Sequence, residues 1–254
     1  MKKVTLLLLA AITTSLSVFA QPSKWFVSVS SGYPFGGPLQ SIKNNMKKSG
    51  LDASIFIPGG SFFGWEVLPK MIEYPKGKQQ APLLLKAGKK IDHHRSLFFS
   101  GGVSNVGEAQ GHAPGTVDTA GYTSYGSSLL NVKFRVLQFT GGYEYSFPHT
   151  RAKVAIGPSL FLLRYKSTDG MIVNERHTAF APGVATSARL PLGKEKHLFG
   201  IDLVAELNLA VPAKMKTLSS GNDIYNQHDL AVLKSGTVNM VHGMLGLACS
   251  FRRK

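Results

Sequence analysis

The links between its β-like segments constrain this chain more than any other feature. From Pro82 onward, segments with alternating apolar and polar residues are joined by links that are short and long in turn. The short links are 93–96, 148–151 and 193–196, and the long ones, rich in Gly, Ser, Thr and Asn, are 108–128, 167–177 and 212–236. Short turns at one end and long loops at the other are typical of an outer-membrane β-barrel.

Eight segments carry the period-two alternation of a half-buried strand. They cover 25–33, 82–91, 97–106, 129–147, 151–165, 180–192, 197–211 and 238–251. One face is large and apolar, and the other is small, Gly-rich and polar, as lipid outside and a narrow lumen inside require. A soluble β-sandwich has no reason to sort its loops by length. We therefore predict an all-β fold, a closed up-and-down antiparallel transmembrane β-barrel of about eight strands.

The segment 129–147 contains a change of phase. Its apolar residues are even-numbered up to Val136 and odd-numbered from Leu137 to Phe147. A shift by one residue turns every side chain to the opposite face of a strand. The pattern therefore predicts either a β-bulge at Val136–Leu137 or a strand that extends beyond the bilayer.

Residues 1–20 have the form of a cleaved signal peptide. Basic Lys2 and Lys3 precede a short apolar run and a small-residue site that ends at Ala20. The expected mature chain, 21–254, is a single barrel domain in the cell outer membrane. The one cysteine, Cys249, cannot form an internal disulfide, which is ordinary for an exported bacterial envelope protein.

The formal net charge of +15 indicates an anionic partner or a solvated basic surface. Export argues against nucleic acid as that partner. The polyanions that an exported chain meets are the phosphates of lipopolysaccharide and other envelope glycans. We therefore expect outer-membrane lipids and lipopolysaccharide as partners, with an unidentified extracellular ligand left open.

Residues 34–81 form a long loop or cap in this prediction. Apolar residues at helical spacing, with Gly50 as a stop, predict a short helix over 38–50. Short strands are also expected around 53–57. Loops of this length are usually functional or locally folded. We therefore expect an interaction surface that comprises Lys43, Lys47, Lys48 and Trp65.

Charges of both signs fall on the predicted lumen face. They are Lys86, Glu144, Lys153, Arg189, Asp202 and Glu206. Buried charges must pair, because an unpaired charge inside a protein is costly. A small barrel is also just wide enough to be filled by side chains. We therefore predict a charge network that plugs the lumen, with a narrow selective channel as the other interpretation.

No residue pattern in the chain predicts an active site, a metal site or a cofactor. His149, His177 and His242 and many loop serines are present, but they form no nucleophile signature. The adjacent pair His93–His94 on a short turn lacks ligand spacing for one metal ion. The glycine pairs lack the following helix of a phosphate-binding loop.

The chain resembles the small outer-membrane β-barrel proteins of Gram-negative bacteria, the OmpX-like and porin-like group. The resemblance covers 25–251 and is carried by the signal peptide, Gly142–Phe147, Gly157–Phe161 and a last strand that ends at Phe251. It implies insertion by the barrel-assembly machinery, which reads the last strand. In that family an aromatic residue usually ends the chain, whereas here Arg252, Arg253 and Lys254 follow.

These observations predict a non-enzymatic barrel with a structural or interaction role through its long loops. Three other functions stay open at this point. One is a lipid-A-modifying acyl hydrolase or transferase in the same fold, and His149 or His242 would be needed for it. The second is a narrow pore for small solutes. The third is a soluble binding barrel in the periplasm.

Overall fold

The computed structural model of the protein describes residues 25–57, 60–62, 65–113, 129–169, 172–193, 199–219 and 231–252. The predicted signal peptide and most of the short link 193–196 lie outside these residues. Within them, no helix combines the length and the apolar character that crossing a membrane would require.

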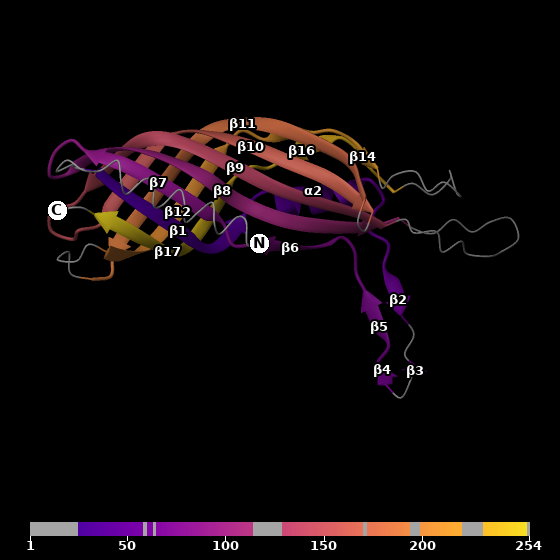
Figure 1. The fold of residues 1–254 in the computed structure, drawn as a ribbon. Helices are drawn as coiled ribbons and strands as arrows, with labels where there is room; N and C mark the ends of the chain where they lie inside the picture. Colours follow the sequence, from indigo (N-terminus) through magenta and orange to yellow (C-terminus); the bar gives the residue numbers. More distant parts are fainter. Residues whose placement is uncertain are drawn as a thin grey trace, which may run out of the picture.

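Eight strand positions close into a ring of antiparallel neighbours. They are β1 (Trp25–Gly36), β7 (Leu83–Lys90), β8 (Arg95–His112), β9 (Leu129–Ser146), β10 (Lys153–Asp169), β11 (Ile172–Pro191), β12 (Phe199–Ala210) and β17 (His242–Arg252). The order is β8-β7-β1-β17-β12-β11-β10-β9, and β9 pairs with β8 to close the ring. Figure 1 shows the resulting tilted barrel. The predicted fold class and strand count are confirmed.

A further strand, β6 (Lys76–Gln80), continues β7 along the same edge of β8. Gln80 pairs with Val106 and Leu83 pairs with Val103, so one register runs through both strands. The break falls at Pro82, which has no backbone N–H to donate to a ladder. The segment 34–81, predicted as a loop or cap, therefore begins and ends in the barrel wall, since 34–36 belong to β1 and 76–80 to β6.

The lengths of the strands account for much of the difference between the short-turn end and the long-loop end of the barrel. β10 has 17 residues and β11 has 20, and only residues 170–171 separate them. Crossing a bilayer takes about 9–11 residues of a tilted strand. Much of the segment 167–177, predicted as a long loop, is therefore strand that extends beyond the bilayer, and so is 108–112 at the end of β8.

The change of phase in β9 arises because the strand extends beyond the bilayer, which is the second of the two predicted causes. Even-numbered residues of β9 face the interior along the whole strand, so no side chain turns over at Val136–Leu137. The polarity of the inward-facing side chains changes instead, since they are apolar up to Val136 and polar from Gln138. The register shift lies instead on the neighbour β8, between Val103 and Asn105. The strand therefore passes from one environment into another.

The barrel accordingly has two zones, which we call the turn-side zone and the loop-side zone. In the turn-side zone the outward residues are large, apolar and exposed, such as Ile156 and Leu160 of β10, and the inward ones are polar or small. In the loop-side zone Phe161, Leu163 and Tyr165 of the same strand are buried inside. An apolar exterior suits lipid and an apolar interior suits water outside. The turn-side zone is thus the membrane-spanning part.

A helix fills part of the loop-side interior. α2 (Pro38–Lys48) starts with proline at its first turn, where the missing N–H costs nothing, and Gly50 with φ 76° follows its end. Ile42 and Met46 are fully buried against the barrel. A hydrogen bond of 3.1 Å from Asn45 Nδ2 to the Thr237 carbonyl joins the helix to a segment near the other end of the chain. The predicted helix is confirmed.

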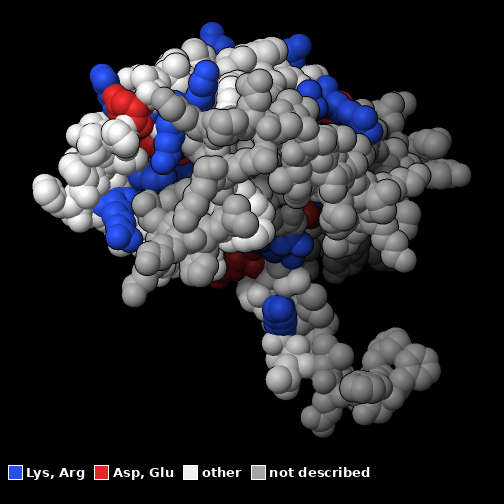
Figure 2. All heavy atoms as spheres, turned by 60° about the vertical axis from the view of Figure 1, so that its left-hand side comes forward, with Lys and Arg blue, Asp and Glu red and all other residues white. Residues whose placement is uncertain are grey.

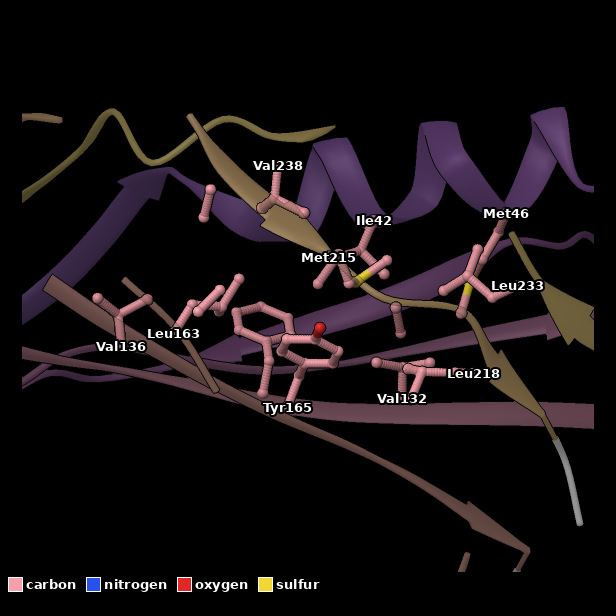
Figure 3. Close-up of a cluster of buried hydrophobic side chains, with 14 of the residues drawn as sticks. Ile42, Met46, Val132, Val136, Leu163, Tyr165, Met215, Leu218, Leu233 and Val238 are labelled. Carbon is pink, nitrogen blue, oxygen red and sulfur yellow. The ribbon is translucent and has the colours of Figure 1, made fainter. Parts of the chain in front are cut away.

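Short hairpins complete the loop side. β13 (Ala213–Met215) pairs with β16 (Gly236–Val238), and β14 (Leu218–Ser219) pairs with β15 (Val232–Leu233). Met215, Leu218, Leu233 and Val238 from these hairpins pack with α2 and with the inner faces of β9 and β10 in one apolar core, as Figure 3 shows. We call this cluster the loop-side core.

A second pair of hairpins projects from the barrel wall as a narrow ribbon (Figure 1). β2 (Ile55–Ile57) pairs with β5 (Lys70–Ile72), and β3 (Gly60–Phe62) pairs with β4 (Trp65–Val67). The expectation of short strands around 53–57 is confirmed.

Candidate functional site

The lumen of the turn-side zone holds a buried cluster of ion pairs. Lys86 on β7 and Glu144 on β9 form an ion pair, and both side chains are nearly inaccessible to solvent. Lys153 Nζ on β10 lies 3.9 Å from the other oxygen of Glu144. The Lys86 ammonium also lies 4.0 Å from the centre of the Phe98 ring. One carboxylate therefore pairs with two ammonium groups, one from β7 and one from β10.

The other three predicted lumen charges also point inward, and the hydrogen bonds described for them involve neutral side chains. Arg189 Nη1 donates to Ser28 Oγ at 2.7 Å across the barrel. Glu206 Oε1 accepts from Gln138 Nε2 at 2.8 Å and from Asn208 Nδ2 at 3.3 Å. Asp202 Oδ2 accepts from Ser250 Oγ at 3.4 Å. The structure thus places all six residues in the lumen and brings Lys86, Glu144 and Lys153 together as ion pairs.

These side chains leave little open volume. A cavity of about 20 Å³ lies between Lys86, Gln138, Arg189 and Glu206. That volume holds roughly one water molecule. In the turn-side zone the lumen is therefore filled by its own side chains. In the loop-side zone the interior is filled by the loop-side core.

A Ser–His pair lies where the two zones meet, and sequence reasoning did not single out its serine. His242 Nε2 lies 2.9 Å from Ser104 Oγ and 3.3 Å from Asn208 Nδ2. Ser104 lies at the register shift on β8, and alternation with Ser100 and Gly102 already places its side chain inward. Its contact with His242 gives no signal in the sequence, because the two residues are 138 positions apart in the chain.

The surroundings of this pair do not fit nucleophilic catalysis. His242 Nδ1 lies 2.7 Å from the Met240 carbonyl rather than from a carboxylate, so its N–H donates to the backbone. Ser104 and His242 are 2 % and 1 % exposed, and the Phe161 ring packs edge-on against the imidazole. A nucleophile needs access for its substrate and an oriented base. The pair instead satisfies buried polar groups between the zones.

Two further histidines lie near the short turns between strands. His149 is exposed on the turn between β9 and β10, and His94 Nδ1 lies 3.2 Å from the Ser146 carbonyl. In the described part of the chain, no group of three or more His, Cys, Asp or Glu side chains is arranged to hold a metal ion.

The predicted interaction surface is spread over two elements. Lys47 and Lys48 are exposed at the end of α2, Lys43 is half-buried one turn earlier, and Trp65 belongs to β4 of the projecting ribbon. The residues of the predicted interaction surface are thus divided between α2 and the projecting ribbon.

Glu175 on β11 fastens the β14 hairpin to the barrel rim. Its Oε1 accepts from the Ser219 hydroxyl at 2.7 Å and from the Ser219 backbone N–H at 3.1 Å, and its Oε2 lies 3.2 Å from His177 Nε2. The Ser219 hydroxyl, above all, holds the pKa of Glu175 below its ordinary value of 4.5. The bonds therefore favour the charged carboxylate.

Acid will loosen this attachment. A lowered folded-state pKa means that the stabilisation is complete above pH 4.5 and is lost as the pH falls through the lower pKa of the folded state. We expect the protection of the backbone amides at 213–219 against hydrogen exchange, relative to the intrinsic rate at each pH, to fall over that range. Glu175→Gln removes the titrating group, so its exchange should not follow this pH dependence. The same dependence in both proteins would contradict the assignment.

Comparisons with known proteins concern the fold alone. No protein-family model matches the chain, and no curated protein matches it. Among solved structures, it is similar to Neisserial surface protein A (13% identity, 91% of this chain and 98% of that chain, TM-score 0.38). It is similar to Ail of Yersinia pestis (13%, 90% and 99%, 0.35) and to OprG of Pseudomonas aeruginosa (10%, 91% and 98%, 0.43).

The architecture itself answers the question of location. The chain is an eight-stranded antiparallel barrel with an apolar outer belt, short turns at one end and extended strands at the other. Closed barrels of this kind are the β-sheet solution to crossing a membrane and belong to outer membranes. The protein has the architecture of an outer-membrane β-barrel.

Proposed function

We propose that the protein is a non-enzymatic outer-membrane barrel that acts through its loop-side zone and conducts no solute. The observation that carries this proposal is the two-zone construction of the strands. Polar side chains fill the membrane-spanning lumen, and an apolar core occupies the interior beyond it. Such a barrel offers a rigid platform outside the membrane, with α2 and the projecting ribbon as its contact elements.

A conductance measurement tests the closed lumen. Purified, folded protein inserted into a planar bilayer should give no stepwise conductance, because a space for about one water cannot pass a hydrated ion. Gel mobility that changes on boiling would first establish that the preparation is a closed barrel. Reproducible channels from such a preparation would favour the pore and overturn the proposal.

The enzymatic alternative has one observation in its favour, the Ser104–His242 contact. Incubation of the folded protein with purified lipid A should release no fatty acid. Release that is abolished by Ser104→Ala or His242→Asn would establish an acyl hydrolase instead.

The partners of the protein follow from the same proposal. Outer-membrane lipids and lipopolysaccharide would surround the turn-side zone, and the barrel-assembly machinery would insert the chain. An extracellular ligand would meet the loop-side zone.

A further inference from the structure

The outer surface of three neighbouring strands carries a group of basic side chains just beyond the apolar belt. Its members, which we call the cation collar, are Lys133 and Arg135 on β9, Arg164 and Lys166 on β10, and Arg176 on β11. All lie on outward-facing positions of their strands. On the turn side of the collar, the outward residues are apolar, ending at Leu137, Leu162 and Phe180.

The collar consists of like charges placed directly opposite one another. Arg135 pairs with Arg164 in the register of β9 and β10. One step farther from the belt, Lys166 pairs with Lys133 on one side and with Arg176 on the other. Directly opposite Cβ atoms in a sheet are about 4.5–5.5 Å apart, and like charges there are destabilising. The fold thus gathers repelling groups in two adjacent rows.

Within the described residues, no carboxylate forms a salt bridge with any of the five. The nearest acidic neighbour by register is Glu108, opposite Lys133 on β8. Its carboxylate is engaged by Asn131 Nδ2 at 2.8 Å and by Lys78 Nζ at 4.0 Å. Lys and Arg also predominate over Asp and Glu on the face drawn in Figure 2. Among the described residues the collar thus has no salt-bridge partner, which leaves its cations available to an anionic ligand.

The depth of the collar identifies the source of that charge. The first row lies two residues beyond the last apolar position, about 7 Å along a strand and about 5 Å along the membrane normal for a tilt near 40°. The polar headgroup layer of one leaflet is about 5–8 Å thick. The collar cations therefore lie at the level of lipid phosphates, at the end of the barrel that faces outward.

We infer that the cation collar is a binding site for the phosphate groups of lipopolysaccharide in the surrounding outer leaflet. Guanidinium groups of Arg135 and Arg164 can each hold a phosphate through paired N–H donors, and Lys133, Lys166 and Arg176 supply the second row. The inference rests on the proposed outer-membrane location, since that location brings the collar to the phosphates.

The test compares phosphorylated with dephosphorylated lipid A, titrated into folded protein in neutral detergent by calorimetry. The double variant Arg135→Gln/Arg164→Gln should bind phosphorylated lipid A about 25-fold more weakly, roughly fivefold for each cation removed. The matched control is Lys89→Gln/Lys90→Gln, two exposed cations at the turn-side end of β7, which should bind as the wild type does. All proteins must first show boiling-dependent gel mobility.

Three outcomes would overturn the inference. The collar variant could bind as tightly as the control, or wild-type protein could bind dephosphorylated lipid A equally well. Vesicles of phosphatidylglycerol could also match lipid A in affinity, which would reject lipopolysaccharide as the source of the phosphates. A protein without boiling-dependent mobility would instead contradict the proposed outer-membrane barrel, so the two failures are distinguishable.

Discussion

Replacing Glu144 by Gln should destabilise the folded barrel by about 3–5 kcal/mol, because the substitution leaves the buried Lys86 ammonium without its counter-charge. Lys153 loses the same partner, although its side chain is less buried. The free energy of unfolding can be measured by urea titration in lipid vesicles, with tryptophan fluorescence and gel mobility as two independent signals.

The control for this prediction removes both charges. Lys86→Met/Glu144→Leu replaces the ion pair by apolar groups of similar size, and such replacements are often neutral or stabilising. The double variant should therefore recover most of the stability lost in Glu144→Gln. A double variant as unstable as the single one would mean that packing, and not charge pairing, gives this cluster its importance.

Replacing Phe161 by Ala should cost about 3–5 kcal/mol of loop-side stability, since the ring is fully buried in the loop-side core. The loss should be local. Hydrogen exchange should accelerate in α2 and in the hairpins at 213–219 and 231–238, while boiling-dependent gel mobility is retained. Hydrogen exchange followed by mass spectrometry resolves these segments.

Leu160→Ala is the matched control, one residue earlier on the same strand. Leu160 is exposed on the outer belt, so its truncation leaves no internal cavity. Its effect on exchange in α2 should be small. Equal acceleration in the two variants would show that the loop-side core is not a separately packed unit.

The strand pattern of this chain determines most of the barrel. Alternation in 197–211 places Asp202 and Glu206 inside and the apolar residues outside, as the structure has them. The helix at 38–48 follows from Pro38, Gly50 and the spacing of Ile42 and Met46. Such local signals depend on periods of two and 3.6 residues, which a sequence displays directly.

Features that depend on distant pairing were not predictable in the same way. The sequence displays the inversion at Val136, but only the register with β8 and β10 distinguishes a bulge from a change of environment. The assignment of 76–80 to the wall requires knowing that β8 extends past Val103. The contact of Ser104 with His242 likewise depends on two segments that are distant in the sequence.

The partners of the lumen charges were also beyond sequence reasoning. Alternation assigns a face to Arg189 and Glu206, but not the strand across the barrel that each one meets. Arg189 reaches Ser28, which is 161 residues away in the chain. Opposite signs therefore did not guarantee ion pairs, and neutral side chains took their place.

The loop-side core also has a consequence for how the chain is assembled. β1 and β17, the first and last strands, form the seam of the ring from Phe26–Arg252 to Gly36–His242. α2 follows β1 after one residue, and β16 ends shortly before β17 begins. Each edge of the seam thus carries one part of the core, and Ile42 meets Val238 only when the edges meet. In a chain whose seam is open, α2 would lack the part of its apolar cover that β16 supplies, so closure of the ring also completes the loop-side core.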